Sequence, residues 1–206
     1  MKKNKKELRD EFEKELQIYL KRELSDMPEL KVTKNKISIT HKKSGASAKI
    51  IFGYLANSNT YEIMIFIEHP ELQQKISHIT PPYPSNLLNP NFIYSMSTVS
   101  EKDACPLLPV TEKGVTNTCQ LILSRIKNNY IPIIFNLFKI TPELIDDVIN
   151  RPKYYSYPFL LIFISMKNNC MTPDKVTIIK ILSEETLGYS NDKQLKSDFN
   201  KQLLLK

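Results

Sequence analysis

Glycine is scarce in this chain, with four residues among 206. The four stand alone in the sequence, at Gly45, Gly53, Gly114 and Gly188. A P-loop or a dinucleotide-binding fingerprint needs several glycines close together, because the backbone must approach a phosphate without interference from a Cβ atom. The spacing therefore excludes both motifs, and we expect no bound nucleotide or other cofactor.

Cysteine is also rare, and the three residues are widely spaced at Cys105, Cys119 and Cys170. An odd number without a CxxC pair indicates neither a disulfide framework nor a zinc site. A reducing cytosol is the simplest compartment for such a chain. We expect Cys119 and Cys170 to be core residues, since an unpaired thiol behaves as a small hydrophobic side chain.

Histidine supplies few candidates for catalysis or metal binding. His41, His69 and His78 lack the HExxH spacing of a zinc site. A two-histidine metal site from His69 and His78 is a minor alternative to surface or loop positions, and we expect no metal. Cys105 could act as a nucleophile with one of these histidines as its base, which would make the protein a thiol enzyme. A buried or incidental thiol is the favoured interpretation.

Long hydrophobic runs are absent as well. No window approaches the 18 uninterrupted apolar residues expected of a membrane-spanning helix. The first residues, MKKNKKELRDEFEKELQ, begin like a signal peptide, but acidic residues from Glu7 onward replace the apolar segment that export requires. We therefore expect a cytoplasmic protein that does not enter a membrane.

Positive charge, with a net value of +7, is concentrated at the two ends of the chain. Residues 1–50 carry an excess of +6 and residues 111–206 an excess of +4, whereas residues 51–110 carry −3. A nucleic-acid-binding surface usually shows a concentrated basic stripe rather than two diffuse basic ends. A nucleic-acid-associated accessory role is therefore an alternative, and not the leading hypothesis.

The first half of the sequence predicts one helix followed by strands. Residues 5–26 have helical period, with an apolar face ahead of Pro28. The period then changes to two, which predicts strands at residues 31–33, 36–40, 48–52, 61–68 and 91–98. In the fourth of these, isoleucines alternate with Met64 and Phe66, which predicts a central strand covered on both faces.

Seven prolines punctuate residues 69–110 and argue against long helices over most of this segment. The long loops there could be functional or could form a rigid crossover between sheet and helices. Both interpretations remain open.

The second half of the sequence predicts a series of helices. Residues 111–151 have the longest continuous helical period, with a kink expected near Pro132. Threonine followed by proline and an acidic residue marks helix starts at Thr141 and Thr172. We also expect helices at residues 158–166, 173–187 and 192–205, the last with Leu195, Phe199, Leu203 and Leu204 facing inward.

Together these elements predict an α+β fold. It contains an N-terminal helix, an antiparallel sheet of four or five strands and a C-terminal series of about five helices. We expect a single domain over residues 1–206, in which residues 1–110 form the helix and sheet and residues 111–206 form a helical half packed on it.

Four tyrosines are the candidate partner-binding residues. Tyr154, Tyr155 and Tyr157 lie in RPKYYSYPF, and Tyr83 lies in the proline-rich TPPYP. Tyrosine combines a rigid apolar ring with a polar tip and is enriched where proteins bind proteins. Packing of these rings on the sheet is the alternative explanation.

The order of elements also carries a resemblance. An N-terminal leucine-rich helix is followed by strands ending in YEIMIFIEH, by a loop, by a long helix that closes on Ile131 and Pro132, and by TPELIDDVINRP. Over about residues 5–165 this order resembles small bacterial immunity proteins of polymorphic toxin and contact-dependent inhibition systems. The resemblance implies an antitoxin that binds a cognate toxin in the cytosol, has no catalytic residues and acts only as a toxin inhibitor. Inhibitors of nucleases are often acidic, whereas this chain is basic. If this chain is such an inhibitor, its charge fits an acidic toxin or one that is not a nuclease.

Overall fold

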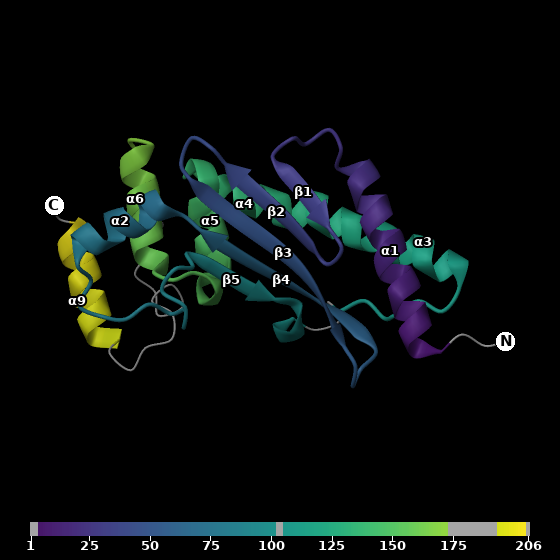
Figure 1. Ribbon diagram of the computed structural model, residues 1–206. Helices are drawn as coiled ribbons and strands as arrows, with labels where there is room; N and C mark the ends of the chain where they lie inside the picture. The colour runs from purple at the N-terminus through teal and green to yellow at the C-terminus, as the bar shows by residue number, and fades with distance from the viewer. Residues whose placement is uncertain (1–3, 102–104, 173–192, 205–206) are drawn as a thin grey trace. The chain divides into compact units, whose positions relative to one another are not determined.

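The computed structural model describes residues 4–101, 105–172 and 193–204 (Figure 1). The helices are α1 (Lys5–Glu23), α2 (Pro70–Ile79), α3 (Glu112–Arg125), α4 (Ile131–Lys139), α5 (Glu143–Asn150), α6 (Pro158–Asn168) and α9 (Lys193–Leu204). The strands are β1 (Leu30–Thr33), β2 (Lys36–His41), β3 (Ala46–Leu55), β4 (Thr60–Glu68) and β5 (Tyr94–Ser97). This order of helix, antiparallel five-stranded sheet and C-terminal helices confirms the predicted α+β class.

The first helix forms because its start is capped and its apolar residues recur at helical spacing. The Asn4 side chain accepts a hydrogen bond from the Glu7 backbone N–H, and the Glu7 carboxylate accepts one from the Asn4 N–H, which completes a capping box. Phe12, Leu16 and Leu20 lie on one face of α1 and are buried. The predicted inward face is therefore confirmed, although α1 ends three residues earlier than expected.

The sheet has the simple order β1-β2-β3-β4-β5, so strands that are consecutive in sequence are neighbours. β1 and β2 pair in antiparallel register, with Thr33 opposite Lys36 across the turn at Lys34 and Asn35, as the sequence predicts. β3 reaches from Ala46 to Leu55 and is longer than the predicted strand.

β4 lies between β3 and β5, which confirms its predicted central position. Ile63, Ile65 and Ile67 alternate along one face and are fully buried. Met64 and Phe66, on the other face, are only half-buried. Alternation of apolar residues therefore identified the strand correctly, but it did not reveal that the two faces are covered unequally.

The short helix α2 was missed by the sequence analysis, which treated this segment as proline-rich loop. His69 is its N-cap, with Nδ1 accepting a hydrogen bond from the Leu72 N–H, and Pro70 occupies the first turn. Glu71 follows at a position that the helix dipole favours for negative charge. The same combination of cap, proline and acidic residue was recognised at Thr141, so the signal for α2 was present in the sequence.

His69 is fully buried, so the expectation of a surface or loop histidine was wrong at this position. Burial disfavours the imidazolium and lowers the pKa of His69, while the Phe138 carbonyl and the Glu71 carboxylate oppose this shift and the Lys75 ammonium adds to it. The folded protein consequently protonates His69 at a lower pH than the unfolded chain does.

This difference predicts a loss of stability on mild acidification. Below about pH 6.5 the unfolded chain binds a proton at His69 that the folded protein resists, so the free energy of unfolding falls as pH falls, until the folded histidine also titrates. His69→Asn keeps a side-chain acceptor at the cap and removes the titration. We expect urea unfolding between about pH 7.5 and 5 to show a shallower pH slope in this variant.

The matched control is His78→Asn, which removes an exposed imidazole near the end of the same helix. The absolute stability of His69→Asn is also expected to fall, because the smaller side chain leaves a cavity. An unchanged pH slope in His69→Asn would contradict the role assigned to this buried ring.

The long helical stretch after Thr111 contains the predicted interruption. Thr111 caps α3, and a π-helical turn at Ile126–Tyr130 joins it to α4. A wider turn of this kind accommodates Pro132, which lacks the N–H that a regular helix uses. The helix therefore changes its winding just before Pro132 and then continues, rather than ending there.

The C-terminal helices confirm part of the predicted series. α5 begins at Glu143, one residue after Pro142, and α6 confirms that residues 158–166 form a helix. The predicted helix at 173–187 and its start after Thr172 lie outside the described residues. In α9 the buried residues are Lys196 and Asn200, while Leu195 is exposed, so the expected inward position of Leu195 was wrong.

The chain divides into two compact units that interleave in sequence. The first contains Met1–His41, Ser47–Phe66 and Met96–Pro132, and the second contains Lys42–Ala46, Ile67–Ser95 and Ile133–Lys206. This division differs from the predicted halves on either side of residue 110. The reason is that β4 and β5 each pass from one unit to the other.

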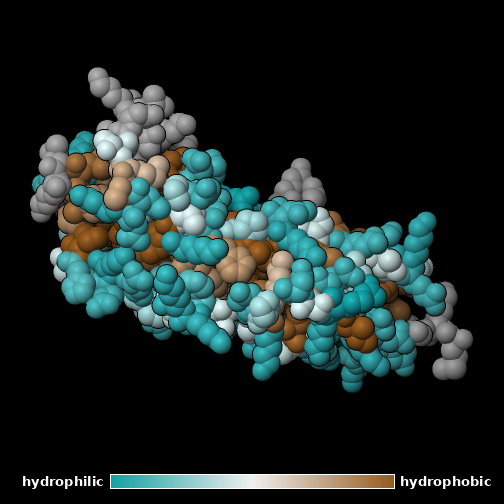
Figure 2. Space-filling model, turned by 90° about the horizontal axis from the view of Figure 1, so that it is seen from above, coloured by the Kyte–Doolittle hydropathy of each residue, from teal (hydrophilic) through white to brown (hydrophobic). Residues whose placement is uncertain are grey.

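The visible surface agrees with amphipathic elements whose apolar sides face inward. Figure 2 shows mostly hydrophilic residues, with hydrophobic residues in separate smaller patches between them. A search of the described residues for a helix with the length and apolar character needed to cross a bilayer found none.

Candidate functional site

Two of the four predicted partner-binding tyrosines lie in the core of the second unit. Tyr155 is 0% exposed, and its ring meets that of Tyr94 edge to face at 4.9 Å between centroids. Tyr154 is also buried, and the centre of its ring lies 6.1 Å from that of Tyr94. The backbone N–H of Ser156 donates to the Ile93 carbonyl at 2.9 Å, which holds this segment against the β5 end of the sheet. Their burial favours the packing alternative for Tyr154 and Tyr155.

The rings of the other two tyrosines, Tyr83 and Tyr157, contact each other. Tyr83 is buried, and the centre of its ring lies 6.0 Å from that of Tyr157. The Tyr83 hydroxyl donates a hydrogen bond to Oδ1 of Asn200 at 2.9 Å. The ammonium of the buried Lys196 lies 5.0 Å from the centre of the Tyr83 ring. Of the four tyrosines, Tyr157 alone is partly exposed, so it alone remains available to a partner in this arrangement.

The cysteines occupy three different environments. Cys119 is buried as predicted, whereas Cys170 is exposed, so its expected core position was wrong. Cys105 is half-buried, and its Sγ lies 3.4 Å from Oγ1 of Thr98, which itself accepts a hydrogen bond from the Ile63 N–H. Within residues 4–101, 105–172 and 193–204, no group of three or more histidine, cysteine or acidic side chains is arranged to hold a metal ion.

The helices α1 and α3 of the first unit pack against each other (Figure 1). A surface groove is lined by residues of both helices and of the loop before α3. Leu8, Glu11, Phe12 and Glu15 form one wall because residues three, four and seven positions apart share one side of a helix. Val115 and Thr116 of α3 lie opposite. We call this hollow the α1/α3 groove, and its complete lining is Leu8, Glu11, Phe12, Lys14, Glu15, Pro109, Val110, Thr111, Glu112, Val115 and Thr116.

The loop before α3 is held in place by backbone hydrogen bonds to the start of β4. The Tyr61 N–H donates to the Pro106 carbonyl at 2.8 Å, and the Leu108 N–H donates to the Asn59 carbonyl at 2.8 Å. This pairing leaves Leu107 68% exposed and delivers Val110, 71% exposed, to the edge of the groove. Apolar side chains are thus presented to solvent by a loop whose backbone is fixed.

The start of α3 completes the groove through close packing. Thr111 Oγ1 accepts a hydrogen bond from the Gly114 N–H at 3.1 Å and caps the helix. A Cβ atom on Gly114 would lie 3.0 Å from that oxygen and 3.3 Å from Cβ of Pro109. Glycine at this position therefore allows Pro109 to lie directly against the first turn of α3.

We call the apolar residues of the groove lining its floor (Leu8, Phe12, Pro109, Val110 and Val115) and the charged residues its rim, which is mostly acidic. The volume of the groove is about 900 Å³, and three carboxylates and one ammonium line it. Glu15 lines the groove together with residues of α3. Burial, and after it the negative charge of Glu15, raises the pKa of the Cys119 thiol in α3 to about 11. The local charge is therefore opposite in sign to the net charge of +7 on the whole chain.

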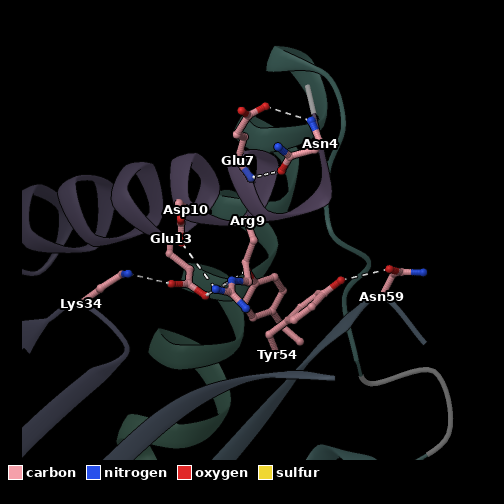
Figure 3. A network of polar contacts seen from close by, with 9 residues as sticks. Asn4, Glu7, Arg9, Asp10, Glu13, Lys34, Tyr54 and Asn59 are labelled. Atoms are coloured by element: carbon pink, nitrogen blue, oxygen red, sulfur yellow. Dashed lines mark hydrogen bonds and ion pairs between the residues drawn. The ribbon is translucent and has the colours of Figure 1, made fainter. Parts of the chain in front are cut away.

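A network of polar contacts anchors α1 from another side of the helix (Figure 3). The mostly buried Glu13 carboxylate lies 3.3 Å from Nζ of Lys34 and 3.7 Å from Nε of Arg9, and it accepts a hydrogen bond from the Tyr61 hydroxyl at 3.4 Å. Burial, reinforced by Glu13, raises the pKa of Tyr61 well above its ordinary value. The Arg9 guanidinium also lies over the ring of Tyr54, 5.7 Å from its centre.

This network fixes the rotation of α1 about its own axis. Glu13 and Phe12 both contact Tyr61 of β4. With these two side chains fixed, the side of α1 that carries Glu11 and Glu15 is held toward α3. The α1/α3 groove is therefore built on secondary structure and on a backbone-paired loop, which gives it a defined shape.

Sequence reasoning missed this groove because it depends on residues about 100 positions apart. The helical stripe of α1 was visible in the sequence, whereas Val110, an apolar residue between a proline and a helix cap, was a signal that had not been used. Nothing in the sequence showed that the two segments meet. Comparison with protein-family models, with curated proteins and with solved structures found no match to this chain.

Proposed function

We propose that this chain is a non-enzymatic binding protein that recognises another protein through the α1/α3 groove. The observation that carries the proposal is the groove itself, with its apolar floor, charged rim and fixed walls. Exposed Val110 and Leu107 beside it form the kind of apolar surface that soluble proteins use for contacts with partners.

The most specific form of this proposal is an immunity protein that neutralises a cognate bacterial toxin in the cytosol. It is supported by the order of elements that resembles such proteins. A bound toxin would be inactivated by occlusion of its active site or of an essential surface, which requires only complementarity from the inhibitor and no catalytic group.

The test is expression of each protein encoded by the genes adjacent to this one, with and without this protein, to find one whose toxicity this protein relieves. We expect growth to be restored and the two proteins to purify together. Val110→Asp should weaken both effects by placing a charge at the apolar edge of the groove, whereas Leu88→Asp, at an exposed site in the second unit, should not. Absence of both rescue and co-purification with the unaltered chain would refute the toxin-neutralising role.

A further inference from the structure

We propose that the α1/α3 groove binds a cationic amphipathic helix of the partner protein. This inference rests on the proposed binding function, but it does not depend on the partner being a toxin. It concerns the chemistry of the bound segment. The shape of the groove indicates a helix, and its charges indicate a cationic one.

The shape of the groove fits a short length of helix. The α1 wall extends from Leu8 to Glu15, which is about two helical turns, or ~10 Å. A partner helix laid along this wall would place apolar residues at positions i, i+3 or i+4, and i+7 over the floor. Leu8 and Val115 are half-buried and Val110 is exposed, so these side chains can gain burial when such a helix binds.

The charge of the groove selects the sign of the partner. Glu11, Glu15 and Glu112 contribute carboxylates to the lining, and Lys14 contributes the single ammonium. Glu112 also offsets the partial positive charge at the N-terminus of α3. Lys113 follows Glu112 in the chain but does not line the groove. A helix with lysine or arginine beside its apolar stripe would therefore complement both the floor and the rim.

The acidic lining also distinguishes this site from a nucleic-acid-binding surface. A phosphate backbone would meet carboxylates here rather than the lysine and arginine side chains that neutralise phosphates. Most of the groove residues belong to the two parts of the sequence that carry the basic excess, yet Lys14 is the one basic side chain in the lining.

The test uses two synthetic peptides of about 18 residues with the same leucine stripe, one with lysine and one with glutamate at the remaining positions. Binding is measured by fluorescence anisotropy, and the site is located by NMR chemical-shift changes. We expect the lysine peptide to bind, to perturb Leu8, Val110 and Val115, and to bind more weakly as salt is added. The glutamate peptide should not bind.

Two charge-matched double variants make the test specific. Glu11→Lys with Glu15→Lys should weaken binding of the lysine peptide about tenfold or more, since two attractive contacts become repulsive. Asp26→Lys with Glu29→Lys makes the same change in net charge at exposed positions outside the groove and should leave the affinity unchanged. Thermal melting monitored by circular dichroism checks that both variants are folded.

The outcomes separate this inference from the proposed function. Equal binding of both peptides, or equal loss in both double variants, would overturn the cationic-helix assignment. Self-association that Val110→Asp abolishes, without binding of the lysine peptide, would also overturn it and would assign the groove to a second copy of this chain. If the lysine peptide binds as expected but growth is not rescued, the groove assignment stands and the toxin-neutralising role fails.

Discussion

Replacement of Tyr155 by alanine should lower the free energy of unfolding by about 3 to 5 kcal/mol, as is typical for a large buried aromatic residue. The side chain is fully buried and packs edge to face against Tyr94. Loss of the ring removes its buried apolar area, leaves a cavity and breaks an aromatic pair that contributes about 0.5 to 1.5 kcal/mol beyond that area. Urea unfolding monitored by far-UV circular dichroism measures this change.

Phenylalanine at the same position separates the ring from its hydroxyl. The Tyr155 hydroxyl is buried and makes no hydrogen bond in the structure, and burial raises its pKa well above the usual value, so the group is neutral near physiological pH. Tyr155→Phe should therefore change stability by less than about 1 kcal/mol, or increase it, because an unsatisfied buried hydroxyl is removed. A loss as large as that of Tyr155→Ala would show that the hydroxyl has a partner.

The same variants bear on the predicted partner-binding role of the tyrosines. Because Tyr155 and Tyr154 contact Tyr94 inside the second unit, truncation of either should act through stability. Tyr157 is half-exposed, and its truncation to alanine should cost clearly less stability than that of Tyr155. If partner binding is lost in Tyr157→Ala while stability is largely retained, Tyr157 would be the one tyrosine with a direct role.

Replacement of Ile65 by alanine at the centre of β4 should cost about 2 to 5 kcal/mol of stability. Ile65 is 1% exposed and lies between Ile63 and Ile67 on the fully buried face of the central strand. Removal of three side-chain carbons there leaves a cavity that neighbouring strands, fixed by backbone hydrogen bonds, cannot close.

Met64→Ala is the matched control, because it shortens the adjacent side chain on the opposite, half-buried face of the same strand. We expect it to cost less than half as much as Ile65→Ala, since less surface is withdrawn from water there. Equal costs measured by urea unfolding would contradict the unequal burial of the two faces of β4.

Local patterns in the sequence were sufficient to predict most elements. Period-two alternation identified the strands, the 3.6-residue period identified α1 and α3, and proline followed by an acidic residue identified the start of α5. The predicted cap of α5 was wrong in detail, because its N-cap is Pro142, which makes no side-chain hydrogen bond, and not Thr141. These predictions succeeded because each depends on residues within one or two turns of one another. The helix α2 could have been found in the same way, since His69, Pro70 and Glu71 form the same kind of start.

Predictions of the environment of individual side chains were less successful. Tyr83, Tyr154 and Tyr155 were candidates for partner binding with packing on the sheet as the alternative, and the structure buries all three. In α9 the inward side chains are Lys196 and Asn200, because the Tyr83 ring and hydroxyl offer polar and cation–π contacts at that position. Such partners lie more than 100 residues away in sequence and leave no local pattern.

The sequence by itself therefore determined the α+β class, an antiparallel sheet of four or five strands and the positions of several helix starts, because short-range periodicity and backbone chemistry are local. Only the tertiary structure showed which face of β4 is fully buried and that the chain forms two interleaved compact units. It also showed that one side of α1 lies beside Val110 and α3. The acidic groove arises from that meeting of distant segments. Its physical cause is long-range packing, which brings residues of one charge together on a chain whose overall charge has the opposite sign.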